Sequence, residues 1–450
     1  MLKGYRGRLF DFKSDSDVSC LKEKYRFFDD GLLVIEEGKI VASGDYSQVI
    51  NNLNQEIDIE SFGECFILPG FIDAHVHSAQ TQAIASYGNQ LLDWLEGYIF
   101  PNERQFEQPE FALEHTRFFF RQLLKNGTTT AAIYPSIHDV SVEVVFDIAS
   151  ELNMRVITGK TWMDCNAPDF LLEDPVQSYE STQKQIEKWH EKGRLHYAIT
   201  PRYAITSSPR SFELAASLLK DYPRLYLQTH VSENRQEVKV VNHHYYNYKG
   251  YLDVYDSFGL LTPRTLLGHG IYLTDIEFEK IAETKARIVH CPSSNLFLGS
   301  GLFDYHKILK YGINLAIGSD VGGGTSFSML QNLNDAYRIS ALKNNTCDDN
   351  PHSFDTLAAL DAFYLITLGG AKTLSLNDMI GNFDPGKEAD FIVIDPLLNE
   401  VLTYRIKNAD SIEDLLFALM ILGDERIIKA TYLMGNRVYN NNVYFEKSDA

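Results

Sequence analysis

The middle of the chain alternates apolar strand-like segments with amphipathic helix-like segments, and this order limits the fold more than any other feature. Helical periodicity fills the gaps between strands, at 107–125, 141–152, 179–192, 211–221 and 275–285. Such alternation predicts parallel strands joined by right-handed crossovers. We therefore expect an α/β fold with a TIM-type (β/α)8 barrel. The alternative is a doubly wound open sheet, but no Gly-rich phosphate loop follows the first strand. The eight strand candidates are 71–77, 128–134, 155–161, 195–200, 225–230, 265–269, 287–290 and 314–319.

Both ends of the chain carry short strand signals separated by turns. Residues 32–44 indicate a hairpin with Gly38 at its bend. Residues 389–395 and 427–439 have the same character near the other end. We expect the two ends to form one small β-sandwich domain together. The predicted division of the chain is 1–67 and 378–450 for the two parts of this β domain and 68–377 for the barrel.

The composition is that of a globular protein with an acidic surface. The 450 residues carry a formal net charge of -20, which disfavours binding to nucleic acid or to anionic membranes and leaves a small molecule as the expected partner. The N-terminus lacks a signal-peptide pattern, and no apolar stretch approaches the length of a transmembrane helix. The five cysteines are scattered and form no CxxC motif, which suits reduced thiols. We predict a cytoplasmic protein.

Histidines gather at the ends of the predicted strands. His75 and His77 are separated by one residue at the end of the first strand, and a side-chain period of two points both rings the same way. Active sites of (β/α)8 barrels lie at the C-terminal ends of the strands. Five of the 13 histidines occupy such ends, so they are expected on one rim together with the carboxylate that ends the eighth strand. The remaining strand-end residues are His230, His269, His290 and Asp320.

Imidazole and carboxylate groups in this pattern suit one divalent metal ion. The minimal ligand set is His75, His77, His230 and Asp320, with one position left for water; His269 either ligates the metal or hydrogen-bonds that water. Zn²⁺ fits these ligands well, and Fe²⁺ is the alternative. Such a metal lowers the pKa of its water toward neutrality, and Asp320 could accept the proton. Lys160 is a candidate for the carbamylated bridging ligand of a two-metal site. Its place on the third strand favours one metal.

Glu233 lies three residues beyond His230, in the loop that leaves the fifth strand. A carboxyl group at this place can protonate a ring nitrogen while a nucleophile adds, and can then pass a proton to the leaving group. Its alternative interpretation is a solvated surface charge, which its position directly after a predicted ligand disfavours. His290 ends a strand, but the metal set is complete without it. Cys291 is interpreted as a core residue.

The strand-end residues resemble those of the amidohydrolase superfamily, in the branch that contains purine deaminases. The shared pattern is His-X-His on strand 1, single histidines on strands 5 and 6, and an aspartate on strand 8. The resemblance is closest to the guanine deaminase family, in which Gln80, Trp94 and the Arg202–Tyr203 pair have counterparts. The similar segments are 69–80, 91–101, 125–130, 200–203, 229–238, 268–270, 290–295, 318–323 and 381–387.

The resemblance implies a zinc-dependent hydrolysis of guanine to xanthine and ammonia, in guanine catabolism. Hydroxide generated at the metal would attack C2, Glu233 would shuttle protons, Asp320 would take the proton of the water, and His269 would stabilise the charge on the attacking oxygen. It also implies a homodimer with one Zn²⁺ per subunit. The implied metal ligands are His75, His77, His230, His269 and Asp320. The implied substrate-binding residues are His77, Ser78, Ala79, Gln80, Trp94, Arg202, Tyr203, His230, Glu233 and Asp320.

Two of these residues make chemical sense as readers of guanine. Gln80 offers a donor and an acceptor, and Arg202 offers donors for an exocyclic oxygen. Trp94 and Phe100 could supply apolar walls for a flat ring. Tyr203 stands where the family often has Phe. The alternatives are a sister amidohydrolase that deaminates 8-oxoguanine, a pterin, cytosine or a triazine, and a metal-binding relative without catalysis. The latter would be expected to lack a ligand, and none is missing.

Overall fold

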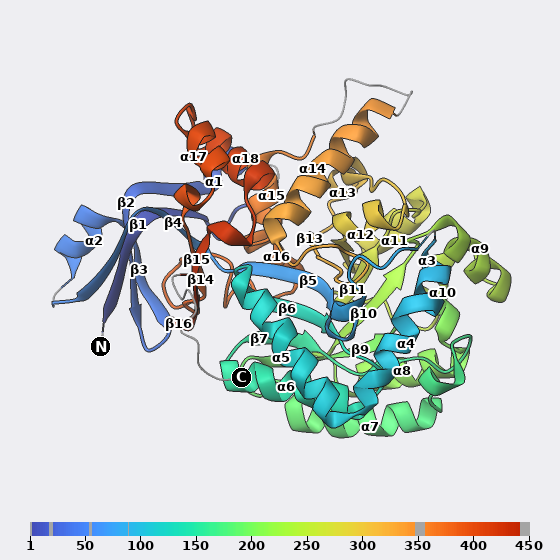
Figure 1. Ribbon diagram of the computed structural model, residues 1–450. Helices are drawn as coiled ribbons and strands as arrows, with labels where there is room; N and C mark the ends of the chain where they lie inside the picture. The colour runs from blue at the N-terminus through green and yellow to red at the C-terminus, as the bar shows by residue number, and fades with distance from the viewer. Residues whose placement is uncertain (1, 18–20, 54–55, 89, 347–355, 442–450) are drawn as a thin grey trace.

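A ring of parallel strands forms the centre of the molecule (Figure 1). The computed structural model describes residues 2–17, 21–53, 56–88, 90–346 and 356–441. Neighbouring strands of the ring follow one another in the chain, and hydrogen bonds next to Asp320 close it: the Asp320 N–H donates to the His75 carbonyl over 2.8 Å. The predicted (β/α)8 barrel is confirmed. Its strands are β5 (Phe71–His77), β6 (Thr128–Tyr134), β7 (Arg155–Thr158), β9 (Leu195–Pro201), β10 (Tyr226–Val231), β11 (Thr265–His269), β12 (Arg287–His290) and β13 (Leu315–Ile317).

The third barrel strand differs from the prediction. The segment expected as one strand, 155–161, is divided into β7 and the short β8 (Thr161–Trp162), which pairs with β9. Gly159 lies at the interruption, where a Cβ atom would stand 2.0 Å from the Ala198 carbonyl oxygen. The backbones therefore approach there more closely than any side chain allows.

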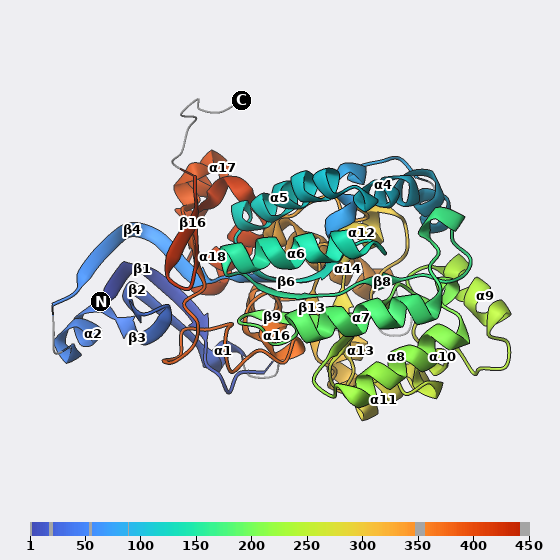
Figure 2. The same cartoon turned by 90° about the horizontal axis from the view of Figure 1, so that it is seen from below.

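Helices cover the outside of the ring (Figure 2). Most expected helices are present with shifted ends. Thus α7 begins at Pro175, because the Asp174 side chain accepts hydrogen bonds from the Val176 and Gln177 N–H groups, and it ends at Trp189. The helices of the barrel are α5 (Pro109–Lys125), α6 (Asp139–Leu152), α7 (Pro175–Trp189), α8 (Pro209–Asp221), α9 (Arg235–His244), α10 (Tyr251–Ser257), α11 (Asp275–Thr284), α12 (Pro292–Phe297), α13 (Tyr305–Tyr311), α14 (Met329–Thr346), α15 (Ala359–Leu365) and α16 (Leu368–Thr373).

The connection from β5 to β6 is the longest helical insertion in front of the ring. It contains η1 (Ser78–Ala83), α3 (Leu91–Trp94), η2 (Leu95–Ile99), α4 (Phe100–Arg104) and η3 (Gln105–Glu107) ahead of α5. These short helices start at the C-terminal end of β5, the end on which the histidines lie. They therefore stand next to the candidate site.

Strand β5 changes the direction of its side chains near its end. Ile72 and Ala74 belong to the apolar cluster inside the barrel, whereas Phe71 and Val76 belong to the outer cluster. The pairing with β6 is irregular between Asp73 and Val76. Without this irregularity, the period of two would place residues 72, 74 and 76 inside and would point the histidines outward.

Both chain ends contribute to one mixed sheet beside the barrel, in the order β16-β15-β14-β4-β1-β2-β3. The hairpin β2–β3 and the C-terminal strands agree with the prediction, and the sheet agrees with the β-sandwich domain expected from the two ends. Helices α17 (Glu400–Ile406) and α18 (Ile412–Leu422), between β14 and β15, were not predicted. The strands are β1 (Lys3–Phe12), β2 (Tyr25–Glu36), β3 (Lys39–Asp45), β4 (Asp58–Pro69), β14 (Phe391–Ile394), β15 (Ile428–Leu433) and β16 (Asn436–Asn440), with helices α1 (Leu21–Lys24) and α2 (Tyr46–Asn52) between the N-terminal ones.

Three other predictions meet the structure in part. The predicted domain boundaries at 67/68 and 377/378 stay predictions. Strand β4 of the terminal sheet continues past the first of them, to Pro69. Cys65, Cys165 and Cys291 are free thiols, whereas Cys20 and Cys347 lie outside the described residues. Among the described residues, none of the helices has the length and hydrophobicity needed to cross a membrane.

A buried ionic network joins the barrel to the terminal sheet. Arg155 at the start of β7 donates from Nε and Nη2 to Glu388 over 3.0 and 2.5 Å. Arg194 donates to Glu388 over 3.1 Å and also binds Asp390. Burial raises the pKa of Glu388, but the hydrogen bonds and charges of the two arginines outweigh this effect and hold the pKa below its ordinary value.

We expect a Glu388→Gln variant to lose about 3 kcal/mol of unfolding free energy at pH 7, because buried Arg155 loses its counter-charge and buried Arg194 keeps only Asp390. A lowered carboxyl pKa contributes stability that is present above the unfolded pKa of about 4.3 and is lost as pH falls through the folded value. The difference between the variant and the unmodified protein should therefore shrink below about pH 4. Urea unfolding at several pH values measures it, with exposed Glu187→Gln as the control. A constant difference across pH would contradict this explanation.

Candidate active site

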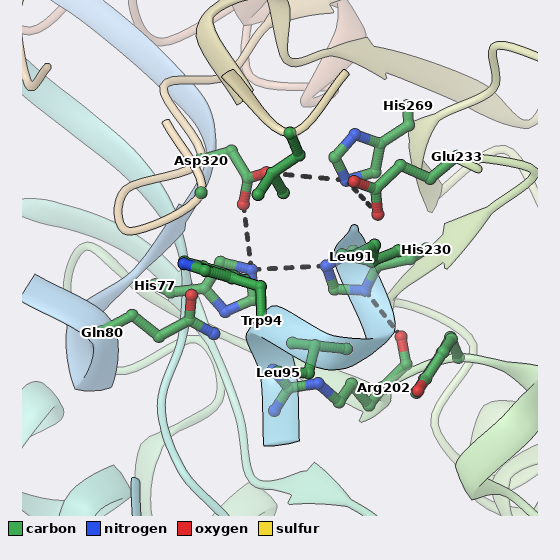
Figure 3. A pocket seen from close by; sticks show the side chains of 13 residues that line it. His77, Gln80, Leu91, Trp94, Leu95, Arg202, His230, Glu233, His269 and Asp320 are labelled. Carbon is green, nitrogen blue, oxygen red and sulfur yellow. Dashed lines mark hydrogen bonds and ion pairs between the residues drawn. The ribbon is translucent and has the colours of Figure 1, made fainter. Parts of the chain in front are cut away.

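Nitrogens of four histidines and a carboxylate oxygen meet at the C-terminal end of the barrel, and Figure 3 shows His77, His230, His269 and Asp320 of this cluster. The Nε2 atom of His77 lies 3.2 Å from His75 Nε2 and 3.3 Å from His230 Nε2. The Asp320 Oδ1 atom lies 3.3 Å from His75 Nε2 and 3.2 Å from His77 Nε2. The ligand atoms of His75, His230, His269 and Asp320 all lie within 4.8 Å of one another. All five predicted metal ligands are therefore in one cluster.

Hydrogen bonds behind two of the rings fix which nitrogen faces the cluster. His230 Nδ1 donates to the Arg202 carbonyl over 2.7 Å, so its Nε2 carries the lone pair. His269 Nδ1 lies 3.0 Å from the Asn295 Oδ1 atom, which can only accept. His269 Nε2 is buried and makes no hydrogen bond within the described part of the chain. Inward-facing lone pairs backed by outer hydrogen bonds are the arrangement found around metal-binding histidines.

The backbone around the cluster is shaped for close packing. A Cβ atom at Gly318 would lie 2.5 Å from the His75 Cβ, and one at Gly268 would lie 2.8 Å from the His75 ring. His269 and Asp320 have φ values of 69° and 50°, in the left-handed region that residues with a side chain rarely adopt. Such strain costs about 1–3 kcal/mol for each residue and is typical of functional sites.

Burial and mutual charges set the protonation of the cluster. Burial lowers the pKa of His75 to about 4 and the pKa of His230 well below its ordinary value, so both rings are neutral at pH 7. Burial raises the pKa of Asp320, but hydrogen bonds from His75 and His77 outweigh it and lower that pKa well below the usual range. Burial also acts to lower the pKa of His269, but the charges of Glu233 and Asp320 outweigh it and raise that pKa above its ordinary value. His75 and His230 thus present neutral imidazoles beside the Asp320 carboxylate, which is the form that binds a divalent cation.

Glu233 faces the cluster from the loop after β10. Its Oε2 atom lies 3.4 Å from His269 Nε2, and Ser300 Oγ donates to its Oε1 over 3.2 Å. Glu237 fixes the loop by accepting the Glu233 N–H over 2.8 Å. The side chain is 3% exposed, and burial raises its pKa to about 7, which opposes the surface-charge interpretation. A carboxyl group of this kind can both donate and accept a proton near neutrality.

A cavity of about 380 Å³ opens above these groups. It combines apolar walls with a few converging polar groups, as small-ligand sites do. Trp94 and Tyr203 line it together with the polar residues Gln80 and Arg202 (Figure 3). The remaining lining residues are His77, Leu91, Leu95, His230, Glu233, His269, Leu298, Asp320 and Gly323.

Comparison with known proteins connects this cavity to a family. The amidohydrolase family profile matches residues 66–438. A guanine deaminase of Escherichia coli is 43% identical over 442 residues, which cover 98% of each chain. The solved E. coli guanine deaminase superposes with a TM-score of 0.92, at 41% identity over 98% of this chain and 100% of that one. This chain belongs to the guanine deaminases of the amidohydrolase family. A solved guanine deaminase of C. acetobutylicum with guanine in its active site is also similar, at a TM-score of 0.86 and 30% identity over 98% and 100% of the two chains.

Most of the predicted site residues line the cavity of this guanine deaminase family member, and a few do not. Ser78 and Ala79 are buried at the start of η1 and do not line the cavity. His290 stacks on Phe303 at 4.3 Å between ring centroids, outside the ligand cluster. Lys160 forms ion pairs with Asp139 and Glu173. This arrangement agrees with the preference for a single metal ion.

Sequence reasoning missed two residues that support the site of this family member. Glu103 on α4 binds both Gln80 and Arg202. Asn295 binds both His269 and His290. Asn295 lies in the 290–295 segment that resembles the family, so the sequence contained a signal that could have marked it as a site residue. Glu103 follows the similar segment 91–101 by two residues and had no periodic or spacing signal of its own.

Proposed function

We propose that this chain hydrolyses guanine to xanthine and ammonia. The observation that carries the proposal is one cavity that contains the His/Asp cluster, the buried carboxyl of Glu233, and the polar pair Gln80 and Arg202. Family membership at 43% identity to a guanine deaminase supports the same substrate. The known chemistry of the fold and the groups lining this cavity therefore point to one reaction.

The donor set fits one divalent metal ion, and we assign it as Zn²⁺. The fit rests on the inward lone pairs and on His269 Nε2, which has no hydrogen-bond partner among the described atoms. His75, His230 and Asp320 would hold the ion together with His77, whose Nε2 lies 3.2 Å from both His75 Nε2 and Asp320 Oδ1. His269, whose ligand atom belongs to the same group as those of His75, His230 and Asp320, would be a fifth ligand or a partner of the bound water. A bound Zn²⁺ supplies a water whose pKa is lowered toward neutrality. Fe²⁺ is the alternative that metal analysis would detect.

Asp320, Glu233 and His269 divide the proton handling. Asp320 accepts the proton of the nucleophilic water, because its carboxylate lies beside two imidazoles and remains ionised. Glu233 donates a proton to the ring nitrogen adjacent to C2 as the nucleophile adds there. The ionised Glu233 then takes the remaining proton of the water from the hydroxyl group at C2 and delivers it to the amino group, which leaves as ammonia when the C2–N bond breaks. The proton on Asp320 returns Glu233 to its acid form. His269 lies 3.4 Å from Glu233 and 3.7 Å from Asp320, between the two carboxyl groups, where it stabilises developing negative charge on oxygen.

Gln80 and Arg202 would form hydrogen bonds with the polar edge of the purine, and apolar side chains would pack against the two faces of its ring. Trp94 and Leu91 supply apolar surface in the cavity. Phe100 packs behind Arg202, with the guanidinium carbon 5.5 Å from the ring centroid, and is not itself among the lining residues. Ser78 and Ala79 contribute through the backbone that carries Gln80.

The test is an ammonia-release assay on purified protein with a panel of guanine, 8-oxoguanine, a pterin, cytosine and a triazine. We expect kcat/KM for guanine to exceed that for each other ring by at least about 100-fold, since sites built around polar edges reject analogues that leave those groups unpaired. Metal content is measured on the same sample. Turnover of another ring in preference to guanine would replace the substrate assignment, and full metal occupancy without any turnover would favour a non-catalytic relative.

We also propose that the protein acts in guanine catabolism, in the cytoplasm, as a homodimer with one Zn²⁺ per subunit. Scattered cysteines without a CxxC motif suit a reducing compartment and support the location. Resemblance to the family supports the dimer. Sedimentation equilibrium measures the subunit number, and a monomer at micromolar concentration would contradict it.

A further inference from the structure

We propose that Glu103 is a positioning residue for substrate recognition, which orients Gln80 and Arg202 so that the cavity selects a purine with an oxygen at position 6. The inference rests on the proposed deamination of guanine. Glu103 does not line the cavity and is 1% exposed, so it acts through the two residues that do.

One carboxylate holds both readers at once. The Gln80 amide nitrogen donates to Glu103 Oε1 over 2.9 Å. Arg202 Nη1 donates to Oε1 over 2.8 Å and to Oε2 over 2.7 Å. All three side chains are buried, and hydrogen bonds to charged groups are stronger than neutral ones when water is excluded. Gln80 lies in η1, just after β5, and Arg202 directly follows β9. Glu103 lies on α4, in the insertion between β5 and β6.

The carboxylate decides which end of the Gln80 amide faces the substrate. A carboxylate only accepts hydrogen bonds, so the amide must turn its NH₂ group toward Glu103. The Gln80 carbonyl oxygen is then left to meet an N–H group of the ligand. Without Glu103, the amide could rotate and present either end, and its recognition of the purine edge would be ambiguous.

The same carboxylate fixes Arg202 as a donor in the cavity. Burial acts to lower the pKa of Arg202, but the charge and hydrogen bonds of Glu103 outweigh it and raise the pKa above its ordinary value. With Nη1 engaged by Glu103, the other guanidinium N–H groups remain for the ligand. A carbonyl oxygen on the six-membered ring accepts from them, whereas an amino group at that position would oppose donor to donor.

The short helix α4 that carries Glu103 is tied to the site at two further points. Asn102 Nδ2 donates to the Ala79 carbonyl over 2.5 Å, next to Gln80. The Phe100 ring lies against the Arg202 guanidinium. One turn of helix thus holds the backbone of residue 79, the side chain of Gln80 and the plane of Arg202. The support is rigid because each contact limits a different degree of freedom.

The first experiment compares Glu103→Gln with the unmodified enzyme. We expect KM for guanine to rise about 10- to 100-fold with kcat within about 3-fold, since misplaced readers weaken binding while Glu233 and the cluster are untouched. The inhibition constant of 2-aminopurine, which lacks the 6-oxygen, should rise by less than about 5-fold. Exposed Glu107→Gln on the same insertion is the matched control. Unchanged KM, or a fall in kcat and folded fraction alone, overturns the inference.

A second experiment tests whether Glu103 acts through Arg202. In an Arg202→Met background, Glu103→Gln should raise KM by clearly less than about 10-fold, because the contact with Arg202 is already gone and only the contact with Gln80 is left to lose. A full 10- to 100-fold effect in that background would sink the role assigned to Arg202. If the Glu103→Gln protein does not fold, this second experiment still tests the inference. The double variant Glu103→Gln/Arg202→Met leaves neither charge buried alone, and it is compared with Arg202→Met. An unmodified enzyme inactive on guanine refutes the proposed function, whereas an active enzyme with an insensitive Glu103 refutes only this inference.

Discussion

Replacement of Glu233 by glutamine is expected to lower kcat for guanine by about 10³-fold while the protein keeps its metal, because general acid–base groups contribute about 10²- to 10⁴-fold. The physical reason is that the amide of glutamine can still form the hydrogen bond from Ser300 but cannot deliver a proton to the ring or to the leaving amino group. The measurement is steady-state deamination of guanine together with metal analysis of the same preparation.

Two comparisons make the Glu233 result specific. Glu279→Gln, an exposed glutamate on α11, should leave turnover unchanged. KM for guanine in the Glu233→Gln variant should stay within about 5-fold, since the readers Gln80 and Arg202 are not in contact with the altered group. Retention of more than about a tenth of the unmodified kcat would remove Glu233 from its assigned role.

Removal of the metal is expected to abolish deamination, with a fall of about three orders of magnitude or more, because the bound ion would supply the water of lowered pKa that attacks the ring. Dialysis against a chelator followed by Zn²⁺ addition should restore the rate. Readdition at 100 times the dissociation constant should also stabilise the fold by about 2.7 kcal/mol, which thermal unfolding measures independently of activity.

Asp320→Asn is the matched test of the ligand cluster. It retains size but removes the charge that faces His75 and His77. We expect weaker Zn²⁺ binding and a smaller stabilisation on Zn²⁺ addition than in the unmodified protein. Full turnover by protein that metal analysis shows to be free of metal would exclude the proposed chemistry.

The barrel and its rim were predictable because their signals are local. Strand and helix periods repeat within short windows, and each candidate ligand stands next to a strand end that the pattern marks. His75, His77, His230, His269 and Asp320 therefore belonged to one rim once the barrel was assumed. The errors fell at boundaries, such as the early start of α7 at Pro175, where a single capping side chain decides the first turn.

The position of Glu103 could not be derived in this way. A lone glutamate in a helical stretch is normally a solvated charge, and residue 103 has no spacing relation to Gln80 or Arg202. Its three hydrogen bonds join residues 23 and 99 positions apart. Helices α17 and α18 lie between the strand-like segments 389–395 and 427–439, in a stretch for which no element is predicted.

The amino-acid sequence alone determined the fold class, the presence of a strand-end histidine cluster and the type of chemistry, because these depend on short-range periodicity and on side-chain identity. The tertiary structure decided which way those side chains face. A regular β5 would have pointed His75 and His77 away from Ile72 and Ala74; the irregular pairing between Asp73 and Val76 brings them into the barrel. The tertiary structure also decided that the buried carboxylate of Glu103 joins Gln80 to Arg202, since only packing brings these three residues from distant segments together.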